Sequence, residues 1–242
     1  MSNGSRFTAV LVATGLALAG WFVGHGFLGA RTVDRFVTVK GVSERDVQAD
    51  VAFWPLQFVS TDDDLGRAQY KIERSKSAII EFLKKHGIDS TQTELQRLEV
   101  TDVLANPYRS GTTGSRFIIS QTLMVRSDNP KLIQAASQKV GELVDAGVVL
   151  TTSGGFEGGP TFLFTRLNDL KPQMIAEATA NARKAAEQFA LDSHSRLGGI
   201  RRANQGVFEI LPRDRAPGIM ESNQVAKTVR VVATIDYYLK NR

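Results

Sequence analysis

Hydrophobic and polar positions divide the chain into an uncharged N-terminal segment and a longer part with strand-like and helix-like periods. From Val37 to Phe53, apolar residues alternate with polar ones, which is the two-residue period of half-buried strands. Pro55 interrupts the second of these strands and indicates an edge or a bulge. The stretch VTVKGVSERDVQADVAFWPLQF therefore predicts a strand, a tight turn and a second strand.

Four polar residues, Ser43, Glu44, Arg45 and Asp46, stand together in the middle of that stretch. They could form a reactive site or the charged tip of a hairpin. A serine nucleophile needs a neighbouring base, and the local sequence holds no histidine. Because turns favour such polar residues, the pattern predicts a hairpin tip.

Three later segments have the 3.6-residue period of amphipathic helices, at about 62–86, 129–144 and 169–197. Thr61 and Asp62 are candidate caps for the first helix, and Gly87 ends it. Pro130 suits the first turn of the second helix. The centre of the third, AEATANARKAAEQFA, is rich in alanine and permits close contact with a neighbouring element.

Further strands are predicted near residues 93–103, 116–126, 161–165, 200–210 and 226–239. The polar loop NPYRSGTTGS joins the first two of these. The element order ββαββαβαββ predicts an α+β fold, an antiparallel-rich sheet with helices on one face. No linker divides this part, so one domain is expected over residues 31–242.

The N-terminal segment FTAVLVATGLALAGWFVGHGFLGA, residues 7–30, carries no formal charge. As a helix it would extend about 36 Å, enough to cross a hydrocarbon core of about 30 Å. We therefore expect residues 1–30 to form a signal anchor with one transmembrane helix. This implies a single-pass protein of the bacterial inner membrane, with the C-terminal part in the periplasm.

A cleaved signal peptide is the alternative, because Ala17-Leu18-Ala19 fits the small-x-small pattern of signal peptidase. Cleavage there would give a soluble periplasmic protein with the apolar Trp21 and Phe22 near its new N-terminus. Gly20 and Gly24 form a G-x-x-x-G pair, a candidate surface for packing membrane helices. Glycine is also common in any membrane segment, so the pair alone is weak evidence for self-association.

Composition narrows the function classes. The chain has 242 residues, 42% hydrophobic and 23% charged, enough for a sizeable core. It contains no cysteine, which excludes disulfides, thiolate metal sites, cysteine nucleophiles and a lipoprotein anchor. The net charge of +5 comes from basic residues interleaved with acidic ones, without the basic stripe and stacking aromatics typical of a nucleic-acid interface. We therefore expect no nucleic-acid partner.

Candidate chemistry is sparse. His25 lies in the apolar segment, whereas His86 and His194 fall at predicted helix ends, where structural roles suit them. The sequence lacks G-x-S-x-G, H-E-x-x-H, the phosphate-loop pattern and the calcium-binding loop, and three consecutive aspartates, 62–64, suit helix capping better than metal binding. These observations predict no catalytic site, cofactor or metal. A hydrolase that uses His86 or His194 is the weakest alternative.

The chain resembles the SIMPL domain family, which includes the YggE-like oxidative-stress proteins and a periplasmic immunogenic protein. The resemblance rests on V-x-V-x-G at residues 37–41, on KKHGID and TELQRLEVTDV, on the alanine-rich helix at 176–190 and on the final alternating strand. It covers about residues 36–239. The second strand starts QADVA at residues 48–52, so the proline typical of the family is missing there.

The resemblance implies an exported envelope protein without an established catalytic site, linked to stress tolerance and envelope maintenance. It also implies large ring-like homo-oligomers. Phe53, Trp54 and Phe58 are candidate subunit contacts, with ordinary core positions as the alternative. A second hypothesis is a small periplasmic binding or adaptor module for a peptide, lipid or partner protein.

Overall fold

The computed structural model of the chain describes residues 3–32, 35–105, 114–152 and 159–241. Its contacts form two compact units, one of residues 1–43, 172–208 and 231–242, the other of residues 44–171 and 209–230. The division falls inside strand β1 (Phe36–Gln48), helix α5 (Leu167–Asp192) and strand β8 (Ala226–Asn241). Because continuous elements cross this division, no linker marks it in the sequence. The sequence pattern therefore predicted one domain over residues 31–242.

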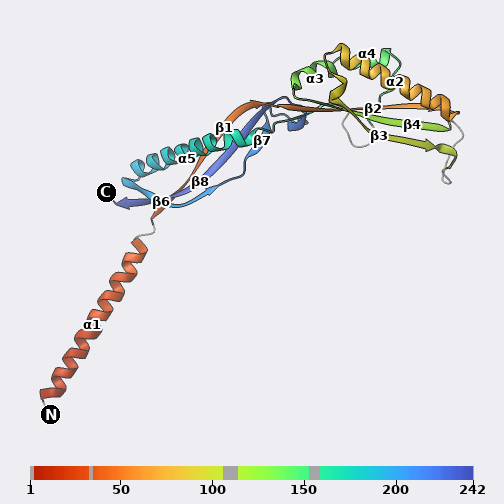
Figure 1. Cartoon of the computed structure of the whole chain (residues 1–242). Helices are drawn as coiled ribbons and strands as arrows, with labels where there is room; N and C mark the ends of the chain where they lie inside the picture. The colour runs from red at the N-terminus through yellow and green to blue at the C-terminus, as the bar shows by residue number, and fades with distance from the viewer. Residues whose placement is uncertain (1–2, 33–34, 106–113, 153–158, 242) are drawn as a thin grey trace. The chain divides into compact units, whose positions relative to one another are not determined.

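The second unit contains a four-stranded sheet in the order β3-β4-β2-β5, antiparallel throughout. Its helices lie on one face of that sheet (Figure 1). The α+β class, with antiparallel pairing and covering helices, is confirmed. The elements are β2 (Val51–Asp62), α2 (Leu65–Lys85), η1 (Ser90–Gln92), β3 (Thr93–Asp102), η2 (Val103–Ala105), β4 (Phe117–Ser127), α3 (Pro130–Ser137), α4 (Gly141–Asp145), β5 (Thr161–Leu163), β7 (Glu209–Pro212) and η3 (Glu221–Asn223).

Alternate residues of β2 build the core of this unit. Trp54, Leu56 and Phe58 are buried in one cluster with the apolar stripe of α2. The Trp54 ring meets the Phe82 ring edge-on, with centroids 6.3 Å apart. The alternate residues of the strand and the apolar stripe of the helix thus pack together in one apolar layer.

The helix boundaries differ from the prediction in two places. Asp64, rather than Thr61 or Asp62, caps α2, because its side chain accepts from the Arg67 N–H. The predicted second helix is divided into α3 and α4, because residues 139 and 140 donate to carbonyls three residues back. Gly87 has φ of 78°, the left-handed conformation expected after a helix C-terminus.

The first unit contains α1 (Asn3–Thr32) and the sheet order β1-β8-β6, with β6 at Ser195–Gln205. Strand β7 pairs with β8 in the other unit. The predicted third helix ends five residues early, at Asp192, because the chain turns through His194 (φ 52°) into β6. The strand predicted at 200–210 is accordingly two strands, β6 and β7.

Helix α5 packs against β1 through small residues. Its buried positions recur every fourth residue, namely Met174, Ala178, Ala182, Ala186 and Ala190. Gly41 of β1 lies beneath them, and a Cβ atom there would be 1.9 Å from the Ala178 carbonyl oxygen and 2.4 Å from the Ala182 nitrogen. The helix backbone can approach the strand this closely only because Gly41 has no side chain.

The predicted hairpin between residues 37 and 58 is wrong. β1 pairs with β8, and β2 belongs to the other sheet. Thr38 donates to Asp236 at 2.7 Å, and Thr228 donates to Asp46 at 2.8 Å, so partner numbers fall as β1 numbers rise. The two strands are therefore antiparallel, and residues 43–46 lie inside β1 rather than at a tip. A two-residue alternation cannot reveal which sheet each strand joins.

The N-terminal segment is one helix, as predicted. Within the described residues, no helix combines the length and the apolar character needed to cross a membrane. The described residues thus show a helix at this place but not the predicted membrane-crossing one.

We predict that Gly41→Ala destabilises the fold by about 3 kcal/mol or more, because the new methyl group overlaps the α5 backbone, which cannot move as a side-chain tip can. Gly199→Ala is the matched control, since a Cβ there meets nothing within 4 Å. The urea midpoint of the full-length protein measures both. Equal midpoints for the two variants would contradict the close packing at Gly41.

Candidate functional site

Within the described residues, strand β3 is an uncovered edge of the second unit's sheet. It pairs with β4 on one side, and the sheet order ends there. Three apolar side chains on β3 are exposed, Leu95 at 48%, Leu98 at 53% and Val100 at 49%. Their partners on β4 include Leu123 and Ile119, which are buried in the core below the helices. The face that is core on β4 thus continues onto β3, where it is open to solvent.

A β-bulge brings these three side chains onto one face. Leu95 pairs with Leu123, but the next paired residue is Arg97, opposite Thr122. Gln96 is therefore the extra residue of the bulge. Without this insertion, Leu95 and Leu98 would point to opposite faces, since their separation is odd.

The edge strand β6 differs from β3 in its exposed apolar residues. Its exposed residues include Arg196, Arg201 and Arg202, although Ile200 is also exposed. Charged side chains on an edge disfavour pairing with another chain, whereas an apolar edge strand favours it. Strand β3 also carries charged residues, but one of its faces exposes three large apolar side chains, whereas Ile200 is the one large apolar side chain exposed on β6.

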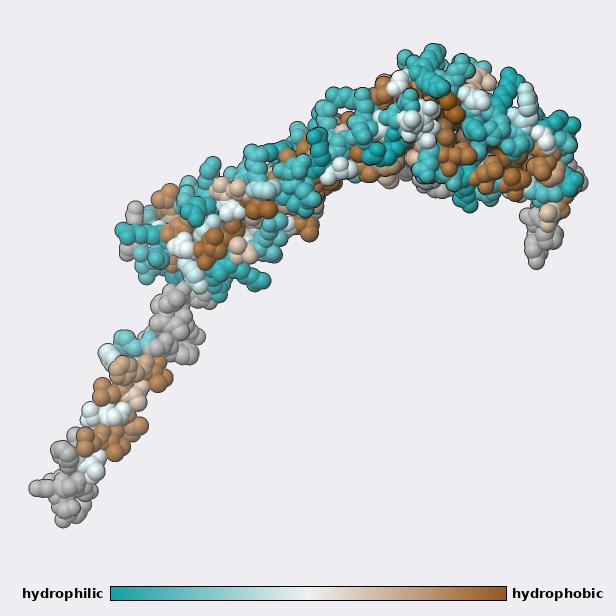
Figure 2. All heavy atoms as spheres, in the orientation of Figure 1, coloured by the Kyte–Doolittle hydropathy of each residue, from teal (hydrophilic) through white to brown (hydrophobic). Residues whose placement is uncertain are grey.

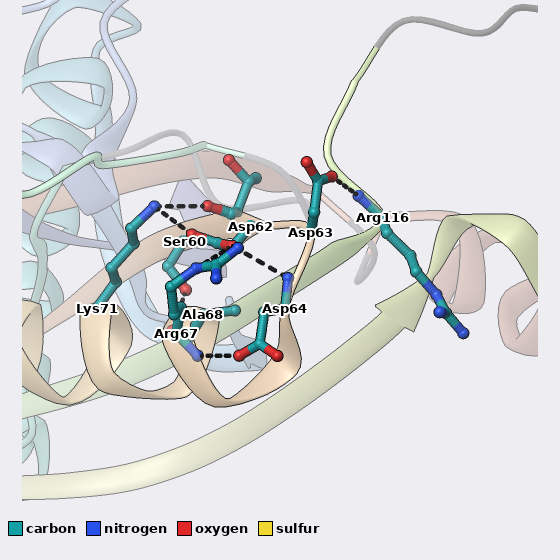
Figure 3. A network of polar contacts seen from close by, with 9 residues as sticks. Ser60, Asp62, Asp63, Asp64, Arg67, Ala68, Lys71 and Arg116 are labelled. Atoms are coloured by element: carbon teal, nitrogen blue, oxygen red, sulfur yellow. Dashed lines mark hydrogen bonds and ion pairs between the residues drawn. The ribbon is translucent and has the colours of Figure 1, made fainter.

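An ion-pair network fixes the β2–α2 junction beside this sheet (Figure 3). Asp62 accepts from Arg67 at 2.8 and 2.9 Å and from Lys71 at 2.8 Å. These hydrogen bonds, that of Arg67 first, hold the pKa of the Asp62 carboxyl well below its usual range. The network ties the end of β2 to the first turns of α2.

The neighbouring aspartate ties the same junction to β4. Asp63 accepts from the Arg116 backbone N–H at 3.0 Å (Figure 3). The Arg116 side chain reaches back to Asp102, at the end of β3, with a shortest distance of 3.0 Å. The hydrogen bonds of that guanidinium lower the pKa of Asp102. Asp62, Asp63 and Asp64 thus each accept structural hydrogen bonds. No group of metal-ligating side chains occurs in the described part of the chain.

The candidate catalytic residues have structural contacts. Ser43 is buried in β1, and its hydroxyl donates to Glu177 at 3.0 Å. His86 lies 3.3 Å from Glu142, whose pKa is lowered by hydrogen bonds from Lys85 and then from His86. His194 occupies the turn between α5 and β6. The histidine ring of His25 stacks on Trp21 in α1, with centroids 4.6 Å apart.

The predicted subunit-contact residues are only partly accessible. Trp54 and Phe58 are 2% and 0% exposed, so they are core residues and that part of the prediction is corrected. Phe53 is half-buried on the opposite face of β2. Gly20 and Gly24 are exposed on α1, with open space around their Cβ positions. Most of the two glycine-containing loops, at 106–113 and 153–158, lies outside the described residues.

Two features of the second unit were missed by sequence reasoning. One is the apolar face of β3. Its leucines lie in the stretch LQRLEV at an odd separation, which predicts opposite faces unless the bulge is known. The other is Lys227, fully buried in β8, which donates to the Glu221 carbonyl at 2.6 Å and pairs with the Glu221 carboxylate. Burial of an isolated ammonium is costly, so this pairing anchors η3 to the sheet.

The second unit also contains a cavity of about 610 Å³ with an uncharged lining. Amide and hydroxyl side chains line it, together with Phe162 and the exposed Met220. A cavity of this size can hold a small ligand. The polar lining residues are Gln134, Ser137, Gln138, Thr161, Ser222 and Asn223.

Comparisons with known proteins identify a family rather than an activity. The family model described as SIMPL, a protein of unknown function, matches residues 37–236. A comparison with curated proteins finds no match. Among solved structures, a crystal structure of a hydrolase from Listeria innocua matches at 14% identity, over 78% of this chain and 90% of that one, with a TM-score of 0.23. That likeness is too weak to support a function.

We predict that Asp62→Asn destabilises the protein at neutral pH and that the difference from wild type shrinks in acid. Because the folded-state pKa of Asp62 lies below its ordinary 3.8, its contribution is present above that value and is lost as the pH falls through the folded-state pKa. Urea midpoints measured between about pH 7 and about pH 3 test this linkage.

The exposed Asp128, which pairs with Arg126, supplies a control of equal charge change in Asp128→Asn. That variant should keep the wild-type response to acid. A constant difference between Asp62→Asn and wild type at all pH values would contradict the ion-pair account.

Proposed function

The chain belongs to the SIMPL family, and from this premise we propose that it is a non-enzymatic, membrane-attached envelope protein that assembles into a large homo-oligomer. On this proposal the assembly is a ring or cage at the bacterial inner membrane, with the SIMPL domain in the periplasm. Its role would be envelope maintenance or stress tolerance.

The observation that carries self-assembly is the uncovered apolar face of β3. An exposed edge strand presents unpaired N–H and C=O groups together with Leu95, Leu98 and Val100. Monomeric proteins protect such edges with charge or with a covering element, but among the described residues no element covers these three apolar side chains. A partner that supplies another strand would satisfy the backbone groups and cover the apolar side chains.

The observation that supports membrane attachment is the exposed apolar surface of α1. Figure 2 shows hydrophobic side chains along this helix. In water their exposure would be unfavourable, so a lipid environment suits them. Gathering several copies of α1 would multiply a weak attachment into a strong one. Its large exposed apolar residues include Leu11, Val12, Leu16, Leu18, Trp21, Phe22 and Val23.

A small binding module is the second candidate, favoured by the cavity beside Phe162 and Met220. Its mixture of amides, hydroxyls and apolar side chains suits an uncharged polar ligand or a peptide segment. This function requires no assembly and predicts a monomer or dimer.

We predict that the protein extracted in mild detergent is a particle of many subunits. Light scattering gives its absolute mass, and intact mass spectrometry tests whether each subunit retains residues 1–19. The double variant Leu98→Lys/Val100→Lys should give markedly smaller particles, because it places charge on the apolar edge. Val144→Lys, on an exposed apolar residue of α4, is the matched control and should leave the mass unchanged.

A wild-type monomer or dimer would overturn the large assembly and favour the binding module. Subunits that begin at Gly20 would retain assembly but remove most of the apolar helix that we propose as the attachment.

We predict that Leu16→Lys/Phe22→Lys moves the protein from the membrane fraction to the soluble fraction. A lysine placed against lipid is unfavourable, because its ammonium group loses water. Extraction of membranes with alkaline carbonate, followed by immunoblotting, measures the distribution. Phe189→Lys replaces an exposed aromatic residue outside α1 and should leave the distribution unchanged. Equal distributions for the α1 variant and wild type would contradict attachment through α1.

A further inference from the structure

We infer that β3 pairs antiparallel with β3 of a second copy, about a twofold axis through Leu98. This inference rests on the proposed self-assembly and names one of its contacts. The open edge of β3 would then become the centre of a continuous eight-stranded sheet, in the order β5-β2-β4-β3 followed by its symmetry mate.

Because of the bulge, the ladder positions of β3 are arranged symmetrically about Leu98. With Gln96 outside the ladder, nine residues of β3 remain paired with β4, and Leu98 is the fifth of them. A twofold axis at Leu98 therefore places every ladder position opposite another one. The cross-strand pairs would be Thr93 with Asp102, Glu94 with Thr101, Leu95 with Val100, Arg97 with Glu99 and Leu98 with itself.

Each of these pairs is chemically compatible. Arg97 of one copy faces Glu99 of the other, and the symmetry repeats this opposite-charge pair. Within one copy the same two side chains are already 3.5 Å apart and largely exposed, so both can exchange intrachain for cross-strand contact. Leu95 faces Val100 on both sides of the central leucine pair. Six apolar side chains that are now exposed would form one continuous patch.

Neighbouring registers are disfavoured by charge. Side chains directly opposite each other must share a face, so the twofold axis moves by whole ladder positions. An axis at Arg97 places that residue opposite its own copy and Glu94 opposite Glu99. An axis at Glu99 places two glutamates together. Like charges directly opposite each other destabilise a strand pair, so the register centred on Leu98 is selected.

Such a contact is isologous and closes after two copies. A ring or cage would therefore need a second, different contact to join the pairs. Pairing at β3 and growth to a large particle are separate properties and can be tested separately.

Site-specific crosslinking is the decisive experiment, because the natural chain has no cysteine. Directly opposed residues in antiparallel strands have Cα atoms about 4.5–5.5 Å apart, within the range of about 4.4–6.8 Å that a disulfide requires. Under mild oxidation, full-length Leu98→Cys should become mostly a disulfide-linked dimer. Thr101→Cys is the control, because two copies of that residue would lie about 20 Å apart.

A charge exchange provides an independent measurement. Arg97→Glu places glutamate opposite glutamate and should reduce crosslinking of Leu98→Cys at least fivefold. Adding Glu99→Arg restores opposite charges across the axis and should restore crosslinking. A merely structural effect of either substitution would not be reversed by the second.

The outcomes separate the two proposals. Efficient crosslinking of Leu98→Cys with charge rescue supports the pairing, even when the wild-type particle has only two subunits and the large assembly fails. A large particle in which Leu98→Cys and Thr101→Cys crosslink equally little overturns the pairing but leaves the assembly. Occupation of β3 by a foreign strand would also leave Leu98→Cys uncrosslinked and overturn the inference.

Discussion

The close approach of α5 to β1 at Gly41 is the constraint on which the first unit depends. Alanine at every fourth position of the helix and glycine on the strand let two backbones meet with almost no side chain between them. This contact decides which face of β1 points inward. Because Gly41 and Ser43 face the helix, Glu44 and Asp46 face away from it and reach β8 instead. The polar residues 43–46 therefore lie in a strand that pairs with β8, and not in a turn.

In the second unit, the helices do not cover the whole face of the sheet. Helices α2, α3 and α4 lie over one face of a sheet that ends at β3. The core formed by Trp54, Phe58 and Ile119 is closed, but the same face on β3 is exposed. Polar contacts around Asp62, Asp63 and Arg116 hold the ends of the strands in register without covering this edge. A partner strand is the simplest means of completing the layer.

The candidate catalytic residues of the sequence have structural contacts in the fold. Ser43, His86 and the three aspartates each have contacts that position backbone elements. Among the described residues, the surfaces open to a partner or a ligand include the β3 edge, α1 and the cavity beside Phe162. The SIMPL family itself carries no assigned activity, so these surfaces are the guide to function.

The sequence by itself determined the family, the α+β class and most of the elements, because alternation, helical periodicity and caps such as Asn129-Pro130 and Gly87 are local properties. It also contained the alanine stripe of α5. Only the tertiary structure decided that β1 and β2 join different sheets, that Trp54 and Phe58 are core, and that Leu95, Leu98 and Val100 share an open face. The reason is that strand partners are chosen by contacts between residues far apart in the chain, and one bulged residue reverses the face of every side chain beyond it.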